Sequence, residues 1–355
     1  MKIVFMGTPE IAVPVLETLI KSEHEVAAVV TRVDTAKGRH GALTPSPVKK
    51  KALEYAITVL QPQKASDPVF LSQLAAFNAD VFVVMAYGKI LKPELLAIPP
   101  LGCVNIHTSL LPMYRGASPI SAVILAGEKE TGVTTMLMDE GLDTGDILLT
   151  EKVAIESKET TLSLEEKLSQ AACGLILRTL AGLNDGSVKP VKQIGDTCYA
   201  GMIKKEDGLI NWNEPAELIE RKIRAYYPWP GAYTTYKGSR IKIFDVDVLP
   251  TGGECTPCSI GTDVAFGAGN STSCSIHADV VSASVEKGVS DAVSAAKESA
   301  PCGTIADLPD NKAITVICGE GNLMINELQA EGKKRMKTAD FLRGVKISVG
   351  EKLGE

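Results

Sequence analysis

The sequence contains no long apolar run, no basic excess and no dense set of cysteines. No stretch approaches the roughly twenty apolar residues that a membrane-spanning helix needs, so we expect no membrane association. The 355 residues have a formal net charge of −6, which argues against a surface that is basic throughout but leaves local basic patches open. Eight cysteines do not form a disulfide framework in a chain of this length, and Cys103, Cys173, Cys198 and Cys318 are expected mainly to pack in the core.

Two common signatures are also missing. The first apolar run ends in Gly-Thr-Pro at residues 7–9 rather than in Gly-x-Gly-x-x-Gly, and Pro9 lacks an N–H for a phosphate. A plain strand-to-helix turn is therefore favoured over a dinucleotide site. Neither Ser109 nor Cys103 lies in a Gly-x-Ser-x-Gly or comparable setting, so we predict no covalent nucleophile. Because residues 2–6 are strand-like from the start, we expect no signal or transit segment and a cytoplasmic location.

The length of the chain predicts two domains. Residues 1–188 alternate strand-like and helix-like segments, and residues 189–207 are expected to be a linker. The apolar run at 81–85 is typical of a strand buried on both faces of a parallel sheet. We predict an α/β fold with a Rossmann-like, doubly wound, mostly parallel sheet. Its strands are expected at 2–6, 26–31, 81–85, 103–107 and 132–138, and its helices at 11–21, 48–56, 69–77, 120–126 and 163–183.

Residues 208–345 are predicted to form a C-terminal, OB-like β-barrel domain. A segment rich in Ser, Ala, Gly and Cys at about 251–301 interrupts this domain as an insert. One helix is expected at 215–226, and short strands are expected at 209–212, 232–236, 240–248, 313–318 and 322–327.

The insert contains a weak candidate for a structural zinc site. Cys255, Cys258, Cys274 and His277 have the spacing C-x2-C-x15-C-x2-H, which fits a zinc site. The surrounding low-complexity sequence offers few side chains to orient metal ligands. Four incidental side chains are therefore the favoured interpretation, and no metal is predicted for the chemistry of the protein.

The residues that indicate chemistry lie at 103–112 and 138–146. If 103–107 is a strand, Asn105 and His107 lie on one face, where the strand runs into a loop. An Asn amide can donate to a developing oxyanion, and an imidazole can take a proton from an amine near neutral pH. An Asp from the second stretch could orient that imidazole and stabilise its charge. These parts suit acyl transfer by direct attack, with a buried His beside a buried Asn as the non-catalytic alternative.

The same two stretches resemble the 10-formyltetrahydrofolate-dependent formyltransferase family. The resemblance rests on Val-Asn-Ile-His-Thr-Ser-Leu-Leu-Pro at 104–112, Arg-Gly at 115–116 and Gly-Leu-Asp-Thr-Gly-Asp at 141–146. Segments at 36–39, 45–49, 86–88 and 223–232 are similar to the methionyl-tRNA formyltransferases within that family. Apart from 251–301, the resemblance runs nearly end to end.

The resemblance implies formyl transfer from 10-formyltetrahydrofolate to the α-amino group of methionyl-initiator tRNA, for translation initiation. It implies Asn105, His107 and Asp143 as the catalytic set. The implied folate-site residues are Ser109, Leu110, Leu111, Pro112, Tyr87, Gly88 and Ile90.

The resemblance implies a role in tRNA binding for a basic loop of about seventeen residues at 31–47. Taken alone, it is either a solvated loop or an arm that becomes ordered on a polyanion. In the family the matching loop engages the acceptor end of tRNA, and its arginine matches Arg39. Further phosphate contacts are expected from 333–337 and 221–224, although a charge run is usually a solvated face. The implied tRNA-binding residues are Lys37, Arg39, Lys333, Lys334 and Arg335.

Three other functions remain open. A glycinamide ribonucleotide formyltransferase would share the Asn-His and Asp signature but would end near residue 190–200. A sugar-nucleotide formyltransferase can have a similar second domain. A non-catalytic tRNA-binding module would not need Asn105, His107 and Asp143 together. We expect the protein to be a monomer.

Overall fold

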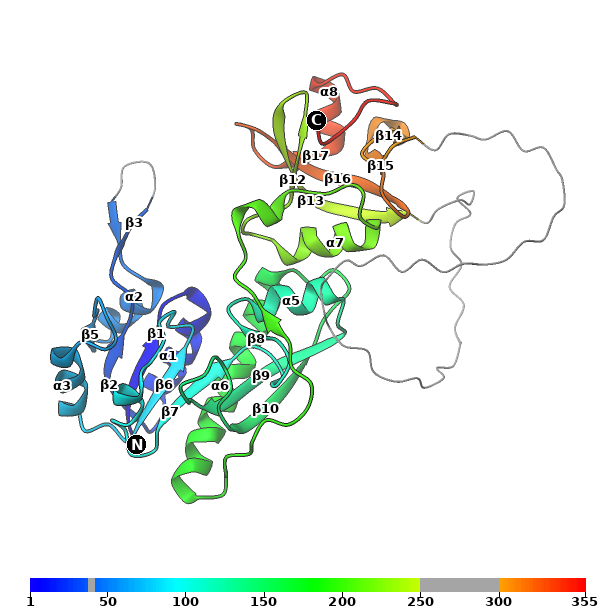
Figure 1. Ribbon diagram of the computed structural model, residues 1–355. Helices are drawn as coiled ribbons and strands as arrows, with labels where there is room; N and C mark the ends of the chain where they lie inside the picture. Colours follow the sequence, from blue (N-terminus) through cyan, green and yellow to red (C-terminus); the bar gives the residue numbers. More distant parts are fainter. Residues whose placement is uncertain (38–41, 250–299) are drawn as a thin grey trace, which may run out of the picture. The chain divides into compact units, whose positions relative to one another are not determined.

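The computed structural model describes residues 1–37, 42–249 and 300–355 (Figure 1). These residues form two compact units, Met1–Ile203 and Lys204–Glu355. Arg39 and the predicted zinc set of Cys255, Cys258, Cys274 and His277 lie outside the described residues.

The first unit is built on a seven-stranded sheet with the order β10-β9-β7-β6-β1-β2-β5. The pairs β1–β2, β2–β5, β1–β6 and β6–β7 are parallel, whereas β7–β9 and β9–β10 are antiparallel. The predicted mostly parallel, Rossmann-like sheet is therefore confirmed. Its strands are β1 (Lys2–Gly7), β2 (Glu25–Val30), β5 (Thr58–Leu60), β6 (Val81–Met85), β7 (Cys103–His107), β9 (Glu130–Leu137) and β10 (Ile147–Ala154).

The helices of the first unit begin where the sequence provides a cap. The Ser46 hydroxyl accepts from the Lys49 N–H at the start of α2, and the Asp67 carboxylate accepts from two N–H groups at the start of α3. Thr160 and Ser163 form a capping box at the start of α6, and Gly186, with a φ of 75°, caps its C-terminus. The helices are α1 (Val13–Lys21), α2 (Pro47–Glu54), α3 (Pro68–Ala76), α4 (Pro93–Leu96), α5 (Pro119–Ala126) and α6 (Thr161–Asp185), with a 3-10 turn at Glu10–Ala12.

Helices cover both faces of the sheet, as a doubly wound fold requires. On one face, Phe70 and Leu74 of α3 pack with Val4, Phe82 and Tyr87. On the other, α6 packs along β9 and β10 and against α1. The central strand β6 is buried at all five positions, which explains its continuous apolar sequence.

Two predicted irregular stretches contain short strands. The loop at 31–47 includes β3 (Thr35–Lys37) and β4 (Ala42–Thr44), which pair antiparallel. The linker at 189–207 includes β11 (Tyr199–Ala200), which pairs in parallel with β8 (Arg115–Gly116). Strands of two or three residues are too short to produce a visible alternation, so the sequence could not indicate them.

The second unit is a curled antiparallel half-barrel, which confirms the predicted OB-like domain. The sheet order is β12-β13-β16-β15-β14, with β17 paired to β16, and a turn at Lys237 and Gly238 joins β12 to β13. The elements are α7 (Ala216–Ala225), β12 (Tyr233–Tyr236), β13 (Ser239–Leu249), β14 (Ile305–Asp307), β15 (Ile314–Ile317), β16 (Asn322–Ala330), β17 (Met336–Lys337), α8 (Thr338–Gly344) and 3-10 turns at Lys205–Gly208 and Pro309–Asn311.

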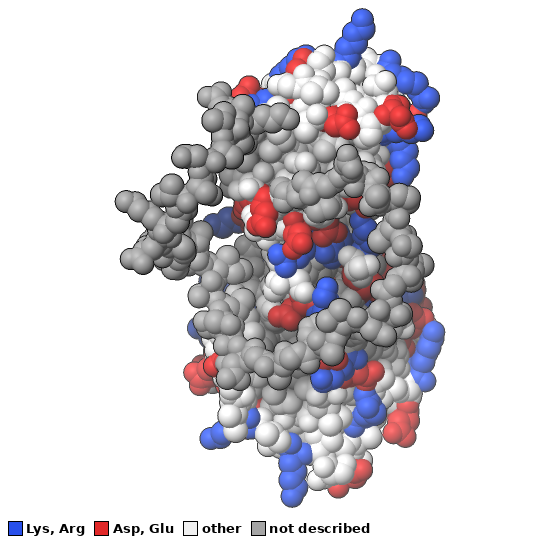
Figure 2. Space-filling view, turned by 90° about the vertical axis from the view of Figure 1, so that its right-hand side faces the viewer, with Lys and Arg blue, Asp and Glu red and all other residues white. Residues whose placement is uncertain are grey.

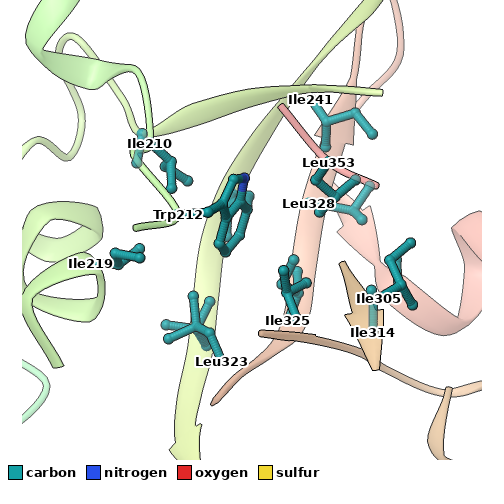
Figure 3. Packing of buried hydrophobic residues seen from close by; sticks show 14 of the residues in the cluster. Ile210, Trp212, Ile219, Ile241, Ile305, Ile314, Leu323, Ile325, Leu328 and Leu353 are labelled. Atoms are coloured by element: carbon teal, nitrogen blue, oxygen red, sulfur yellow. The ribbon is translucent and has the colours of Figure 1, made fainter. Parts of the chain in front are cut away.

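The core of the second unit surrounds Trp212 (Figure 3). Its indole Nε1 donates to the Thr234 hydroxyl at 3.1 Å, which satisfies the buried N–H. The predicted strand at 209–212 is wrong, because this segment makes only an isolated bridge between Leu209 and Tyr233. Ile210 and Trp212 of this segment both point into the core. Within the residues that the structure describes, no helix has the length and apolarity to cross a membrane.

Candidate active site

Asn105 and His107 lie on β7, between the parallel neighbour β6 and the antiparallel neighbour β9. Asn105 is opposite Val84 on one side and Met136 on the other, and His107 is opposite Thr134. Because alternate residues of a strand face the same side, the two polar side chains share one face of the sheet. Asn105 is half-buried, and the His107 side chain is only 6% exposed.

The turn after β7 fixes the orientation of the His107 ring. The Nε2 atom lies 2.9 Å from the carbonyl oxygen of Tyr114. A carbonyl can only accept, so Nε2 carries the hydrogen and the lone pair of the neutral ring is on Nδ1. The Ser109 hydroxyl donates to the Met113 carbonyl at 2.7 Å and holds the same turn together.

Asp143 approaches His107 from the acidic stretch between β9 and β10. Its Oδ2 lies 3.6 Å from His107 Nδ1 and accepts a 2.8 Å hydrogen bond from the backbone N–H of Gly116. The side chain is 13% exposed, and the residue has a φ of 55°, a left-handed conformation that Asp tolerates better than most residues. The structure thus brings together two of the predicted catalytic residues, with Asn105 on the same face of the same strand as His107.

The local sequence explains the shape of the acidic loop. The Asp139 carboxylate accepts from the Gly141 N–H at 3.0 Å and from the Thr144 hydroxyl at 2.7 Å. A Cβ at position 145 would lie 1.7 Å from the Leu137 carbonyl oxygen, so only glycine fits there. These features fold the loop back on the end of β9 and direct Asp143 towards β7.

The predicted folate residues follow two adjacent parallel strands. Residues 109–112 follow β7, and residues 87–90 follow β6, so both segments leave the same edge of the sheet. Ser109 and Leu111 are buried, whereas Ile90 is 81% exposed. Burial raises the pKa of Tyr87 to about 12, an effect that the nearby Arg32 guanidinium opposes.

The predicted tRNA-binding residues differ in how they are paired. Lys333 and Lys334 are exposed, and neither is in an ion pair within the part of the chain that the structure describes. Arg335 donates to Glu327 at 2.7 Å and lies 4.7 Å from the centre of the Phe244 ring. Lys37 is in β3, and its side chain is not described.

The basic residues of α7 are already neutralised in part. Lys222 contacts both carboxylate oxygens of Glu214, at 2.5 and 2.6 Å, and Arg224 forms a two-point ion pair with Glu220 at 2.7 and 2.8 Å. On the face shown in Figure 2, Lys and Arg side chains are interspersed with Asp and Glu. The described surface on that face is therefore mixed in charge, as expected for a chain without a basic excess.

Sequence reasoning missed Gln193, which lies in the segment predicted as a linker, residues 189–207. Its amide bridges Arg115 to the backbone of the acidic loop, with bonds to the carbonyls of Asp143 and Gly145. Nothing in an aperiodic segment marks its one glutamine as part of a site. Its neighbour in space, Arg115, is part of the motif on which the family resemblance rests.

Comparison with known proteins identifies the class. Residues 1–180 match the family described as formyl transferase, and residues 202–346 match the formyl transferase C-terminal domain. The chain is 42% identical to the methionyl-tRNA formyltransferase of Lachnospira eligens, over all of both chains. It is 52% identical to that of Clostridium botulinum over 250 residues, 70% of this chain and 81% of the relative.

A solved structure has the same fold at low identity. The N-formyltransferase of Helicobacter canadensis, in complex with folinic acid and dTDP-3-aminofucose, superimposes with a TM-score of 0.59 and 17% identity. The match covers 92% of this chain and 98% of that one. Fold and site therefore define a two-domain formyl transferase. The chain belongs to the methionyl-tRNA formyltransferase family.

Proposed function

We propose that this protein transfers the formyl group of 10-formyltetrahydrofolate to the α-amino group of methionine esterified to initiator tRNA. The reaction is a direct attack without a covalent enzyme intermediate. The family membership supports the reaction class. The observation that carries the assignment of roles is the arrangement of His107, with Nε2 on the Tyr114 carbonyl and Nδ1 towards Asp143.

The proton route follows from that arrangement. Free α-amino groups titrate near 7.7–8.0, and only the neutral amine can attack the formyl carbon. As the C–N bond forms, the amine releases a proton to His107 Nδ1, directly or through water held by Asp143. The Asp143 carboxylate stabilises the imidazolium that results.

Asn105 has the complementary role at the oxygen. Its side-chain N–H donates to the oxyanion of the tetrahedral intermediate, a contact of a kind that contributes on the order of a hundredfold to a thousandfold in rate. Collapse of the intermediate breaks the bond between the formyl carbon and N10 of the folate. N10 then takes up a proton, and tetrahydrofolate leaves.

We assign the donor to the two loops at the sheet edge. Ser109, Leu111 and Pro112 after β7, together with the segment 87–90 after β6, would contact the folate. The exposed apolar side chain of Ile90 suits the flat face of a pterin. A metal is not part of this proposal, since Asn105, His107 and Asp143 supply the donor, base and charge that the transfer needs.

We assign the tRNA to basic residues of both units. Arg39 follows β3 in the sequence and precedes β4, and we assign it to the acceptor end because of the family resemblance. Lys333, Lys334 and Arg335 are candidates for phosphate contacts. We propose further that the enzyme is monomeric and cytoplasmic.

A sugar-nucleotide formyltransferase is the second candidate, because the Helicobacter canadensis structure shares the fold over nearly the whole chain. The sequence identities favour methionyl-tRNA as the acceptor, because the chain is 42% identical to a methionyl-tRNA formyltransferase and 17% identical to the sugar enzyme. The second unit argues against a glycinamide ribonucleotide formyltransferase, which would end near residue 190–200.

The test is a formylation assay with 10-formyltetrahydrofolate and three acceptors: methionyl-initiator tRNA, methionyl-elongator tRNA and a dTDP-amino sugar. We expect rapid formylation of the initiator tRNA alone, and its loss in Asn105→Ala, His107→Ala and Asp143→Ala. Formylation of the sugar nucleotide in preference to the tRNA would overturn the proposal. Binding of tRNA without any transfer would indicate a binding module instead.

A further inference from the structure

The connector, residues 189–203 of the first unit, contacts the elements on both sides of the candidate site. Val191 and Ile147 exchange backbone hydrogen bonds of 2.8 and 2.9 Å at the start of β10. The Thr197 hydroxyl donates to the Pro112 carbonyl at 2.7 Å, and β11 pairs with β8. The connector is therefore packed along the acidic loop and the turn after β7.

Gln193 makes the most specific of these contacts. Its Nε2 donates to the carbonyls of Asp143 and Gly145 at 2.9 and 2.7 Å, and its Oε1 accepts from Nε and Nη2 of Arg115 at 3.1 and 2.7 Å. Both N–H bonds and both lone pairs of the amide are used. Carbonyls only accept and a guanidinium only donates, so the chemistry of the partners fixes the orientation of the amide.

Through these bonds Gln193 holds the backbone carbonyl of Asp143 directly and its carboxylate indirectly. Its backbone carbonyl is held directly by Gln193, in a residue with a left-handed φ of 55°. Its carboxylate is held by the N–H of Gly116, and Gly116 follows Arg115, which Gln193 also holds. One amide thus ties the loop that supplies the carboxylate to the strand that anchors it.

We propose that Gln193 is a positioning residue for formyl transfer, because it sets the position of the Asp143 carboxylate relative to the His107 imidazole. This inference rests on the proposed function for its role in the reaction. A glutamate at position 193 would keep the bonds from Arg115 but would place a carboxylate against two carbonyl oxygens. A methionine would keep the shape of the side chain and lose all four bonds.

A double-mutant cycle tests whether Gln193 acts through Asp143. We expect Gln193→Met to lower kcat by about tenfold to a hundredfold, with the KM of both substrates changed by less than about threefold. In the Asp143→Ala background, the same substitution should change kcat by less than about twofold. Effects that multiply in the double variant would overturn the positioning role.

Amide hydrogen exchange at Gly116 gives a measurement that needs no substrate. The Gly116 N–H donates to Asp143, so Gln193→Met and Gln193→Glu should each speed its exchange by about tenfold or more, as Asp143→Ala should. If Gly116 exchange is unchanged in both Gln193 variants, the inference fails even where formylation is confirmed. If the protein formylates no tRNA, the proposed function fails, while the exchange result still decides whether Gln193 positions Asp143.

Gln61→Met is the matched control. This half-buried amide also uses both ends: it donates to the Arg32 carbonyl and Asp34 at 2.7 and 2.8 Å, and accepts from Lys49 at 2.7 Å. The substitution removes a comparable set of bonds in the same unit without touching Asp143. We expect no change in Gly116 exchange and a kcat, at saturating tRNA, within about twofold of wild type. If Gln61→Met changed Gly116 exchange and kcat as much as Gln193→Met does, loss of stability alone would explain the effects of both substitutions.

Discussion

The imidazole of His107 is held by the backbone carbonyl of Tyr114, with Nε2 at 2.9 Å from the carbonyl oxygen. This contact, seven residues along the chain, is local and does not depend on any substrate. It leaves Nδ1 as the basic atom, facing Asp143 at 3.6 Å. The turn after β7 therefore selects the tautomer in which the proton acceptor is turned towards a carboxylate.

Replacing His107 with glutamine should separate the structural from the chemical role of the ring. A glutamine amide can still donate to the Tyr114 carbonyl, so the turn should remain folded, but it cannot accept a proton near neutral pH. We expect kcat to fall by about a hundredfold to ten-thousandfold while the thermal midpoint changes little. Formylation kinetics and a melting curve on the same preparation provide the measurement. A kcat near wild type would show that another group takes the proton.

Gly116→Ala should lower both activity and stability. Gly116 has a φ of 111°, and a Cβ there would lie 2.7 Å from the Ala200 carbonyl oxygen. The clash should separate β8 from β11 and withdraw the N–H that binds Asp143. We expect a loss of about 1–3 kcal/mol in the free energy of unfolding and a drop in kcat of at least about tenfold. Gly174→Ala, where an added Cβ meets nothing within 4 Å, is the control and should leave kcat unchanged. Wild-type kcat in Gly116→Ala would contradict the prediction.

The fold was predictable where burial produces a clear pattern. The five buried residues of β6 form a continuous apolar run, from which the strand at 81–85 was predicted. The edge strand β10 was missed, because Glu151 and Lys152 interrupt its apolar pattern, and β5 has only three residues. At 209–212 the apolar residues predicted a strand, but Ile210 and Trp212 are buried as single side chains and the segment pairs only through an isolated bridge.

The site was predictable in part. The common face of Asn105 and His107 follows from strand periodicity, whereas the partner Asp143 was chosen on family resemblance among several acidic residues of one loop. No local pattern could indicate that Gln193, fifty residues from Asp143 along the chain, holds that loop. Contacts between distant segments depend on the tertiary fold, which a single sequence does not state.

The pairing of the basic residues predicts which of them contribute to tRNA affinity. Each phosphate contact should add about 0.7–0.9 to the slope of log Kd against log salt concentration. Lys333→Ala combined with Lys334→Ala should therefore weaken tRNA binding and reduce that slope by about one to two, without changing the KM for the folate. Lys222→Gln should leave the slope unchanged, because Glu214 already neutralises Lys222. Measurement of Kd at several salt concentrations tests both, and the reverse order of effects would contradict the assignment.

Alkaline pH should destabilise the protein through buried phenols. Burial raises the pKa of Tyr87 and of Tyr226 from the ordinary value of 10 to about 12. The folded state therefore keeps protons that the unfolded state has released, so this part of the stability is present below pH 10 and is lost as the pH rises towards 12. In a spectrophotometric titration of the eight tyrosines, Tyr87 and Tyr226 should be among those that ionise late, together with unfolding. Tyr87→Phe should remove one of the late phenols and make the loss of stability with rising pH less steep. Early ionisation of every tyrosine in the folded protein would show that both phenols are accessible to solvent.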